Sequence, residues 1–472
     1  MTFKKLILLC LFTFLHFHLA ATKIDVTTFT ESNIIERDVC IIGGGASGTY
    51  AAVRLLQSGK SVALIEKKDR LGGHVNTYVD PITKLSFDFG VQFFDNITVV
   101  LNYAKSLNTS LISLGADSPP KYANFGTGKL VTTSIIPSIT AQAKAFLTYR
   151  KIANQYSFLN NGFDLPHPVP EDLLISFGEF IQKYNLSAMA VTSSNLGVGN
   201  ILTAPTLYMM KYLPPVSVDG YFVSGKQLTT FNQNNQGLYN NALDYIGNHT
   251  NVFLSSKITQ IERDDCGVQV VVSNPDGEKL IKASKLLISI PPNLENLESI
   301  HLDLVEQENS IFGQFINNYY WNMVIKNTGL PNGTPFIVNV QPEAPDLIAT
   351  EPSPMFIQQT QVTGLYVVDY GSPHNISNDQ VKADVLATLA RIDAANGFST
   401  NSTPEIVAFD NHSPYELRVP SEAIKNGFYG DLNALQGQRN TWWTGAAFHS
   451  PDSSLLWNWT EYNLLPKILA SL

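Results

Sequence analysis

Three glycines near the N-terminus have the spacing of a motif that binds phosphate groups. Gly43, Gly45 and Gly48 form the pattern G-x-G-x-x-G. In this pattern the first glycine permits a sharp turn, the second lets the backbone approach a pyrophosphate, and the third lets a helix pack closely on a strand. Free N–H groups at the start of that helix can then hold the phosphates. These residues, with Ala46 and Ser47 between them, are candidates for binding a dinucleotide.

Such a motif needs a strand before it, a helix after it and a second strand that ends in an acid. Residues 38–42 are typical of a buried strand, and residues 62–65 of the second one. Glu66 follows, eighteen residues past Gly48 and next to Lys67, where a carboxylate can bind a ribose hydroxyl. A glycine motif alone is weak evidence, but this order of elements predicts a dinucleotide-binding βαβ unit.

A second glycine-rich segment indicates which dinucleotide is bound. It reads Arg70-x-Gly72-Gly73-His74-x-x-Thr77, which resembles the second fingerprint of FAD enzymes of the flavin-containing amine oxidase superfamily. The resemblance implies that Arg70, Gly72 and Gly73 line the pyrophosphate and flavin and that His74 serves cofactor binding. It implies FAD as the cofactor, and a mobile loop that happens to contain paired glycines is the alternative.

Two later segments resemble other FAD-contacting parts of this superfamily. Residues 85–94, which include Val91, resemble the segment that runs back past the flavin ring. Residues 252–289 are typical of short strands and end before Pro291-Pro292. In the superfamily a residue at the position of Ile258 touches the adenine through its backbone. The alternative for this region is a plain β-meander.

The C-terminal segment resembles the part of the chain that returns to the flavin. Residues 441–448 resemble a strand and a glycine turn at the pyrophosphate, and a helix from Ser454 follows a boundary and cap at residues 451–453. In the superfamily this helix points its positive N-terminal end at the flavin. The residues implied at the cofactor here are Gly445, Ala446, Leu455 and Leu456, with Trp457 close by as a catalytic candidate. An amphipathic surface helix with a tryptophan in the core is the alternative.

The length of 472 residues exceeds what one core usually holds, so two domains are expected. The order of segments predicts an α/β fold with an FAD-binding Rossmann-like domain of the GR2 type, assembled from residues 36–110, 221–300 and 405–472. A mixed α+β substrate domain is expected from residues 111–220 and 301–404.

Residues 1–20 are typical of a secretory signal peptide. Lys4 and Lys5 precede an apolar stretch over residues 6–19, and Ala20-Ala21 resembles a cleavage region. The apolar run is shorter than the roughly 20 residues that a membrane span needs. We therefore expect a secreted or lumenal protein without a membrane span.

Asn-x-Ser/Thr sequons agree with secretion and predict N-glycans. They begin at Asn96, Asn108, Asn185, Asn248, Asn332, Asn375, Asn401, Asn411 and Asn458. The formal net charge of −9 argues against a nucleic-acid partner. Cys40 and Cys266 alone would remain after loss of Cys10 with the signal, so neither a disulfide framework nor a metal cluster is expected and electrons must pass through the flavin.

Tyr320 and His412 are the catalytic candidates outside the cofactor motifs. Tyr320 stands in an expected strand where amine oxidases of the superfamily often carry a lysine, which argues against simple amine oxidation unless the strand slips and Lys326 is the match. His412 lies where some of these enzymes carry a cysteine bonded to the flavin 8-methyl. A histidyl–flavin bond, a flavin-facing acid/base and an exposed histidine in a glycosylated loop remain open for His412. His449 is either catalytic or a polar core residue.

Within the superfamily the chain looks most like the secreted fungal β-cyclopiazonate dehydrogenase (oxidocyclase)-like group. The resembling stretches are IIGGGASGTYAAVRL, LIEKKDRLGGHVNTYVDP, DFGVQFFDN and GAAFHSPDSSLLWNW. The resemblance implies an oxidoreductase that moves a hydride from a hydrophobic amine, alkaloid or similar metabolite to flavin N5, with oxygen or another external acceptor taking the electrons. The alternatives are a double-bond isomerase of polyunsaturated fatty acids, a non-catalytic secreted flavoprotein and a plain NAD-binding module.

Overall fold

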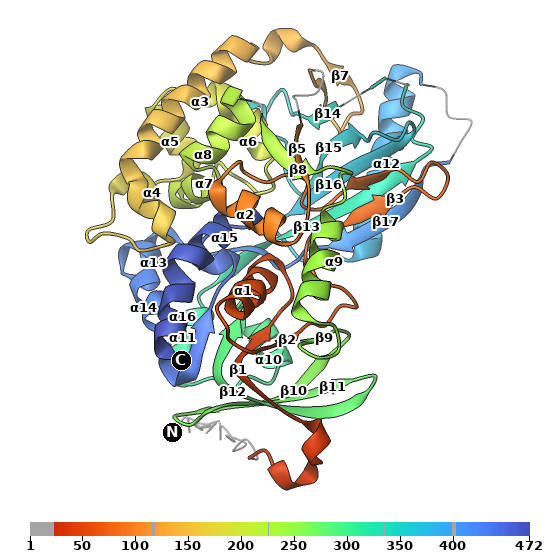
Figure 1. Ribbon diagram of the computed structural model, residues 1–472. Helices are drawn as coiled ribbons and strands as arrows, with labels where there is room; N and C mark the ends of the chain where they lie inside the picture. The colour runs from red at the N-terminus through yellow and green to blue at the C-terminus, as the bar shows by residue number, and fades with distance from the viewer. Residues whose placement is uncertain (1–22, 115–118, 225, 332, 335, 399–402) are drawn as a thin grey trace, which may run out of the picture.

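The computed structural model describes residues 23–114, 119–224, 226–331, 333–334, 336–398 and 403–472. The expected signal peptide at residues 1–20, Asn332 and Asn401 lie outside the described residues. The chain forms one β-sheet region at the bottom of the molecule, a second one at the upper right and a group of helices at the upper left (Figure 1). The predicted mixed α/β architecture is confirmed.

The lower sheet has seven strands in the order β10-β11-β12-β1-β2-β9, and β19 pairs with the part of β12 that extends beyond β11. The strands are β1 (Ile34–Ile42), β2 (Val62–Ile65), β9 (Val252–Phe253), β10 (Lys257–Asp264), β11 (Gly267–Asn274), β12 (Gly277–Ile288) and β19 (Thr441–Trp443). Strands β19, β12, β1, β2 and β9 run parallel. Their carboxyl ends therefore lie along one edge of the sheet.

Helix α1 (Ala46–Gln57) connects β1 to β2 and packs against α9 (Asn235–Ile246) and α15 (Ser453–Trp459). The last four residues of β1 and all of β2 are buried. They form continuous apolar runs rather than alternating ones, as expected for parallel strands covered on both faces. This local pattern explains why the sequence predicts the βαβ unit correctly.

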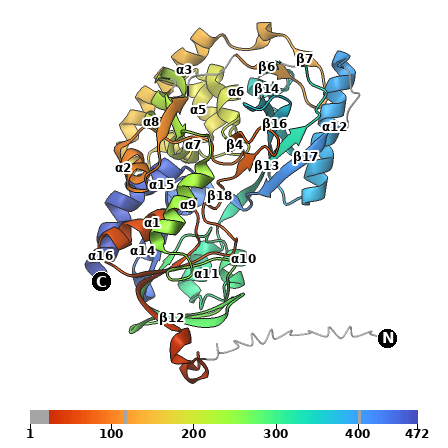
Figure 2. The same ribbon diagram turned by 45° about the vertical axis from the view of Figure 1, so that its right-hand side comes forward.

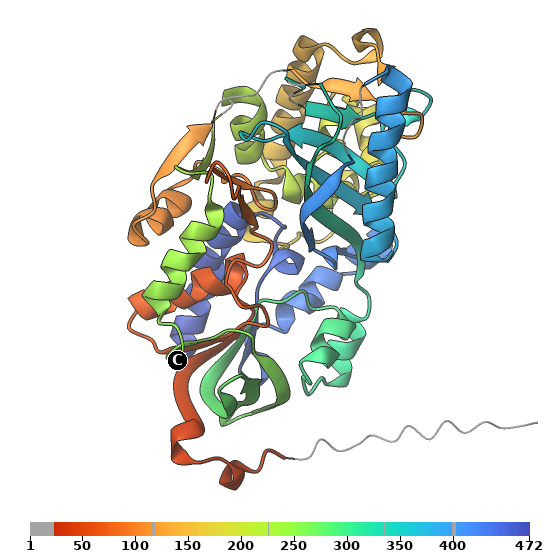
Figure 3. The same cartoon turned by 90° about the vertical axis from the view of Figure 1, so that its right-hand side faces the viewer.

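The upper sheet has eight strands in the order β17-β13-β16-β15-β14-β6-β7, with β18 also paired to β13. The strands are β6 (Lys121–Ala123), β7 (Leu130–Val131), β13 (Ile316–Lys326), β14 (Phe336–Asn339), β15 (Ser353–Gln359), β16 (Leu365–Ser372), β17 (Glu405–Asn411) and β18 (Tyr415–Arg418). Helix α12 (Asn378–Asn396) covers this sheet (Figure 3). Val381, Val385, Leu389 and Ile392 of α12 share one apolar cluster with the β13 residue Trp321, and their spacing is that of one helix face.

The pairing of strands β17 and β18 differs from the domain assignment that the sequence predicts for residues 405–472. Both pair with β13 in the upper sheet, whereas the sequence assigned residues 405–472 to the cofactor domain. The strand pattern of this segment could not show which of the two sheets it joins. Within this segment, β19 is the strand that pairs in the lower sheet.

Short helices fill the upper left of the molecule and meet the upper sheet (Figures 1 and 2). They are α2 (Thr98–Ser106), α3 (Ile139–Ala153), α4 (Glu171–Leu174), α5 (Phe177–Lys183), α6 (Ala190–Ser194), α7 (Thr206–Tyr212) and α8 (Pro215–Val218). The remaining elements are α10 (Leu294–Ser299), α11 (Glu306–Phe312), α13 (Ser421–Lys425), α14 (Phe428–Ala434), α16 (Leu465–Ser471) and the strand pairs β3 (Thr77–Val79) with β4 (Ser86–Asp88) and β5 (Leu111–Leu114) with β8 (Gln227–Thr230). Among the described residues no helix combines the length and the apolar character that a membrane crossing requires.

Arg263 of β10 ties the C-terminal strand β19 into the lower sheet. Its buried guanidinium donates to Asp303 at 2.6 Å and to Glu308 at 2.8 Å, and also to the hydroxyl of Thr441 at 3.3 Å. Arg439, just before β19, pairs with the same Asp303. These oxygen partners compensate the buried charge of the Arg263 guanidinium. The network therefore fixes where the C-terminal segment returns to the sheet.

Candidate cofactor and active site

Loops from distant parts of the chain meet at the carboxyl edge of the lower sheet. Gly43 follows β1 with φ +100°, and Gly445 follows β19 with φ +106°. Ser289 follows β12 between them, and its hydroxyl donates to the carbonyls of Ile42 at 3.0 Å and Gly43 at 2.8 Å. A Cβ on Gly445 would lie 3.4 Å from the Ser289 carbonyl. In α/β sheets the crevice outside the carboxyl ends of the strands is where ligands bind.

The first glycine turn brings helix α1 very close to strand β1. A Cβ on Gly48 would lie 2.0 Å from the Gly43 carbonyl oxygen, so the predicted role of the third glycine in helix–strand packing is confirmed. Gly45 is the N-cap residue, and within the described residues no side chain caps α1. The amides of Ala46 and Ser47 in the first turn thus form an uncapped positive helix end, which suits a pyrophosphate.

The second glycine segment faces the first. Gly72 and Gly73 have φ values of +112° and +58°, and a Cβ on Gly73 would lie 3.0 Å from the Cα of Gly45. Gly90 closes this region, because a Cβ there would lie 2.1 Å from the carbonyl oxygen of His74. The glycines therefore leave a backbone-lined surface between the two segments, which suits an FAD pyrophosphate.

Glu66 is held at the end of β2 with only 7% of its surface exposed. Its two carboxylate oxygens accept the amides of Gly44 at 2.6 Å and Lys68 at 2.8 Å. Each oxygen keeps further lone pairs, so the carboxylate can still accept a ribose hydroxyl. Lys67, a predicted cofactor contact, is exposed. Ser256, two residues before the predicted adenine contact Ile258, donates its amide to the Glu66 carbonyl at 3.0 Å.

Two further predicted contacts are engaged by neighbouring side chains. Arg70 donates to Asn76 and, at 2.9 Å, to the Oε1 atom of Gln236. The carbonyl of Val91 accepts the side-chain amide of Asn235 at 2.9 Å. These contacts tie the Gly-Gly segment and the 85–94 segment to the start of α9.

His412 packs against the Gly-Gly segment. Its ring stacks on that of His74 with centroids 4.3 Å apart and 12° between planes. Its Nε2 lies 3.0 Å from Nδ2 of Asn76 and 3.5 Å from Oδ2 of Asp410. The alternative of an exposed histidine is wrong, because His412 is 3% exposed while the neighbouring Asn411 is exposed. Strand β17 ends here and turns the two successive side chains to opposite sides.

Charge and burial act in opposite directions at His412. Burial lowers the pKa of His412, which favours the neutral ring, and Asp410 opposes this shift. Burial alone would raise the pKa of Asp410, but His412, Lys68 and Asn76 together hold it below its usual range. Asp410 is therefore an ionised partner directly behind a neutral imidazole. Burial also lowers the pKa of His74.

Tyr320 lies one contact further into the upper sheet. Its ring stacks on Tyr415 at 4.8 Å and lies 6.0 Å from the His412 ring. Its hydroxyl donates to Asp369, whose pKa is raised to about 7 by burial. Lys326, the alternative match to the lysine of amine oxidases, lies at the far end of β13 and pairs with Glu405 at 3.0 Å. The strand register expected from the sequence therefore places Tyr320, not Lys326, near His412.

Asp452 occupies the start of α15, where backbone donors to the flavin were expected. The amide of Leu455 donates to the Asp452 carboxylate at 2.9 Å, and that of Leu456 donates to the Asp452 carbonyl at 3.0 Å. Neither amide is free in this structure, which corrects the expectation. Burial raises the pKa of Asp452, and the neighbouring carboxylate of Asp95 raises it further. The predicted cap itself is confirmed.

Trp457 is fully buried and belongs to an aromatic cluster between α15, α1 and α2. Its ring lies 4.8 Å from Tyr103, 5.3 Å from Phe94 and 5.9 Å from Tyr50. Its indole N–H donates to the carbonyl of Ala46 at 3.1 Å. These contacts hold α15 against the first turn of α1, so Trp457 positions the helix that bears the candidate phosphate-binding amides.

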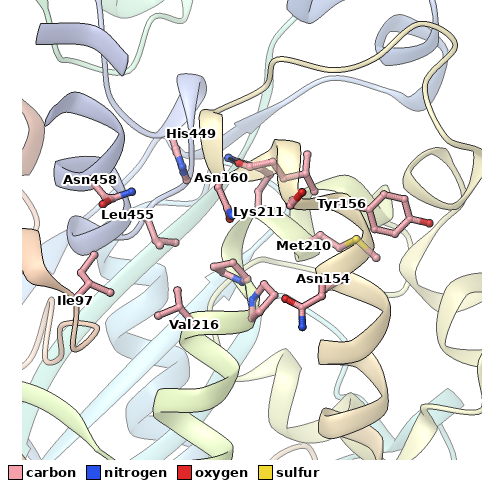
Figure 4. A pocket seen from close by; sticks show the side chains of 15 residues that line it. Ile97, Asn154, Tyr156, Asn160, Met210, Lys211, Val216, His449, Leu455 and Asn458 are labelled. Atoms are coloured by element: carbon pink, nitrogen blue, oxygen red, sulfur yellow. Dashed lines mark hydrogen bonds between the residues drawn. The ribbon is translucent and has the colours of Figure 1, made fainter. Parts of the chain in front are cut away.

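A cavity of about 310 Å³ lies between the helices of the upper region and α15 (Figure 4). Lys211, Asn160 and His449 lie at one side of it, and Val216 and Leu455 at the other. His449 is buried and its Nδ1 lies 3.2 Å from the hydroxyl of Ser450. Apart from α15, its helices belong to residues 111–220, which the sequence assigned to the substrate domain, but no motif near Lys211 predicted a site there.

Comparisons with known proteins agree with this architecture. Residues 41–107 match the model of the NAD(P)-binding Rossmann-like domain family. The FAD-dependent oxidoreductase oblC of Cochliobolus heterostrophus is 38% identical over 94% of this chain and 93% of that protein. The chain belongs to this family of FAD-dependent oxidoreductases. β-Cyclopiazonate dehydrogenase of Aspergillus oryzae is another relative, 34% identical over 90% of this chain and 92% of its own length.

Solved structures extend the likeness in fold to amine oxidases. A fatty acid isomerase from P. acnes superposes with a TM-score of 0.72 at 18% identity, covering 91% of this chain and 98% of the isomerase. Putrescine oxidase superposes with a TM-score of 0.62 at 18% identity, covering 93% of this chain and all of the oxidase. The predictions of an FAD enzyme with an amine oxidase-like fold are confirmed.

Gly48→Ala tests the approach of α1 to β1 in this FAD-dependent family. The added Cβ would overlap the Gly43 carbonyl, so we expect loss of most bound FAD and a free-energy cost of about 1–3 kcal/mol or more. The measurements are the FAD-to-protein absorbance ratio and the thermal midpoint. Gly430→Ala is the control, because a Cβ there meets nothing within 4 Å. A normal FAD content in the Gly48 variant would contradict the assignment.

Asp452→Asn tests the buried cap. A carboxyl whose folded-state pKa is raised keeps its proton in the fold, so stability is lost as pH rises above the ordinary value of about 4. The side-chain oxygen of the asparagine can still accept the hydrogen bond from the Leu455 N–H. We therefore expect the thermal midpoint of the variant, relative to wild type, to rise between pH 5 and pH 8.

Asp25→Asn serves as the matched control, since Asp25 is an exposed cap whose pKa is lowered by hydrogen bonds from Thr27. Asp25 is ionised in both the folded and the unfolded protein from pH 5 upward. The thermal midpoint of its variant should therefore change with pH between pH 5 and pH 8 as that of wild type does. If the thermal midpoint of the Asp452 variant also changed with pH as that of wild type does, the pKa of the Asp452 carboxyl would not be raised in the folded protein.

Proposed function

We propose that the protein is a secreted FAD-dependent oxidoreductase that removes a hydride from a hydrophobic small molecule, such as an amine, an alkaloid or a similar metabolite. Oxygen or another external acceptor then takes the electrons. The observation that carries this proposal is the stacking of His412 on His74. It places a buried histidine with an acidic partner against the segment implied in FAD binding, at the boundary between the two sheets.

FAD, when bound, supplies the redox chemistry by accepting a hydride. Oxidation of a C–H bond beside an N–H or O–H bond also releases a proton, which a base must take. His412 suits this role because burial favours its neutral form, and Asp410 at 3.5 Å stabilises the imidazolium that results. Asp410 and Asn76 both lie beside Nε2, so the nitrogen that takes the proton is Nδ1, in the tautomer that carries its hydrogen on Nε2 toward Asp410.

Tyr320 and Tyr415 extend this site into the upper sheet. Tyr320 brings a phenol hydrogen-bonded to Asp369 to the strand position where amine oxidases often carry a lysine, and its ring lies parallel to that of Tyr415. An aromatic wall without a charged amine suits an apolar substrate. This arrangement favours a hydrophobic metabolite over a small polycationic amine.

Secretion is supported by the positions of the sequons. Asn96, Asn108, Asn185, Asn248, Asn375 and Asn411 are all exposed. Asn458 differs, because it is half-buried and lines the cavity beside α15. An attached glycan needs an exposed asparagine, so six of the seven described sequons are sterically open to modification.

His412→Gln tests the proposed base. We expect the rate of anaerobic flavin bleaching by a panel of indoles, amines and polyunsaturated fatty acids to fall about 10²–10⁴-fold, with FAD content unchanged. The wild-type rate should rise with pH as His412 loses its proton, and this dependence should vanish in the variant. His167→Gln, at an exposed histidine, is the control and should behave as wild type.

Other outcomes of this experiment separate the alternatives. A shifted double bond without hydrogen peroxide or net flavin reduction would indicate an isomerase. A flavin that neither the panel nor a chemical reductant bleaches would indicate a non-catalytic flavoprotein. Acid precipitation tests the histidyl–flavin bond: a yellow pellet in wild type and a colourless one in His412→Gln supports it, whereas a yellow supernatant from wild type excludes it.

Expression of the full chain in a eukaryotic host tests secretion and glycosylation. We expect the protein in the medium, with a mass that falls on enzymatic removal of N-glycans. Peptide mapping should place the sugars on the exposed sequons, and Asn458→Gln should leave the glycosylated mass unchanged. Retention of an unglycosylated protein inside the cell would refute the secretory assignment.

A further inference from the structure

Lys211 of α7 is buried beside the cavity and has no acidic partner in the part of the chain that the structure describes. The residue is 3% exposed, and its ammonium donates to the carbonyls of Leu159 at 2.6 Å and Gly162 at 3.1 Å. The ring of Phe163 lies 5.1 Å from the nitrogen. Among the described residues, no carboxylate forms an ion pair with it. An ammonium has three donors, so one remains after the two carbonyls are satisfied.

A buried cation without an anion is energetically unfavourable. Burial lowers the pKa of Lys211 well below its usual value, and burial followed by the charge of Lys211 lowers the pKa of His449. The two carbonyls lie at the end of the 3₁₀ segment Asn154–Asn161, where a neutral donor would serve equally well. Without an anion beside it the neutral amine is therefore favoured, whereas an anion next to the Nζ atom would favour the charged ammonium.

The cavity next to this charge has the size and lining of a small-molecule site. Its volume of about 310 Å³ falls within the range of ligand pockets. Ile97, Val216 and Leu455 give the cavity apolar lining away from Lys211 (Figure 4). An occupant that matches both sides is an apolar molecule with one acidic group.

The cavity shares a wall with the candidate cofactor site. Leu455 lies in the first turn of α15 and lines the cavity, while Trp457 of the same helix contacts the carbonyl of Ala46 beside the glycine turn. Helix α15 thus contacts both the cavity and the first turn of α1 at the candidate cofactor site. This position suits a part of the substrate that anchors it while the reacting atoms lie elsewhere.

We propose that this cavity binds the carboxylate end of an apolar small-molecule acid, held by an ion pair with the Nζ atom of Lys211, and that this acid is the substrate. The identification as substrate rests on the proposed function, whereas the binding site itself does not. A carboxylate at this point would supply the missing counter-charge and use the third donor of the ammonium.

Calorimetric titration of the FAD-loaded protein with octanoate and octanamide tests the site. The two molecules have the same shape and differ in charge. We expect wild type to bind octanoate more tightly, and Lys211→Met to weaken octanoate binding roughly tenfold or more while leaving octanamide unchanged. Lys151→Met, at an exposed lysine of α3, is the matched control and should retain the preference.

Val216→Trp gives an independent test if the Lys211 variant fails to fold. The larger side chain enters the cavity from the apolar side, so binding of both octanoate and octanamide should fall while thermal midpoint and FAD content stay near wild type. Equal affinity of wild type for the two probes, absence of octanoate binding, or unchanged octanoate binding in Lys211→Met or Val216→Trp would each overturn the proposal.

Anaerobic flavin bleaching distinguishes this proposal from the proposed function. Acids that bleach the flavin faster than their amides, with the difference lost in Lys211→Met, would support both. Bleaching that is equal for acid and amide would reject the acid as the substrate and leave the oxidoreductase function intact. Octanoate binding that depends on Lys211, with no bleaching by the acids, the amides or the panel of indoles and amines, would support the site and reject the proposed removal of a hydride from such substrates.

Discussion

The approach of helix α1 to strand β1 is the constraint on which the cofactor region depends. With 2.0 Å between a Cβ at Gly48 and the Gly43 carbonyl, the helix can start here only if the residue has no side chain. That start directs an uncapped helix end over the carboxyl edge of the parallel strands. Ser289, Gly73 and Gly445 each take their position relative to the same turn, so four separate segments form one backbone-lined surface.

The two sheets are coupled directly beside that surface. The amide of His412 donates to the Tyr320 carbonyl at 2.9 Å, which ties the His412 loop to β13. On the other side, Lys68 pairs with Asp410 at 3.1 Å and Asn76 donates to the same carboxylate at 2.8 Å. Because these groups are partly or fully buried, water does not screen them strongly. The geometry of the proposed base therefore depends on both sheets at once.

The sequence predicts the residues whose roles are local and misses those that depend on distant contacts. The glycine turns, Glu66 and the Asp452 cap follow from backbone conformation within a few residues, and the structure bears out their conformations. The burial of His412 depends on Asn76, 336 residues away in sequence, and no pattern near either residue shows it. Likewise, strand alternation at residues 405–418 does not reveal that β17 pairs with β13. No sequence pattern near Lys211 predicts its burial, because the residues around it come from separate helices.

The return of the chain end to the lower sheet has a consequence for biosynthesis. Strand β19 comes from residues 441–443, yet it completes a sheet that begins at residue 34. Domains that are contiguous in sequence can fold while the ribosome is still translating. Here the lower sheet lacks β19 until residues 441–443 have been synthesised. A nascent chain paused before residue 441 would therefore leave residues 286–288 of β12 without their partner strand, as an unpaired edge open to chaperones.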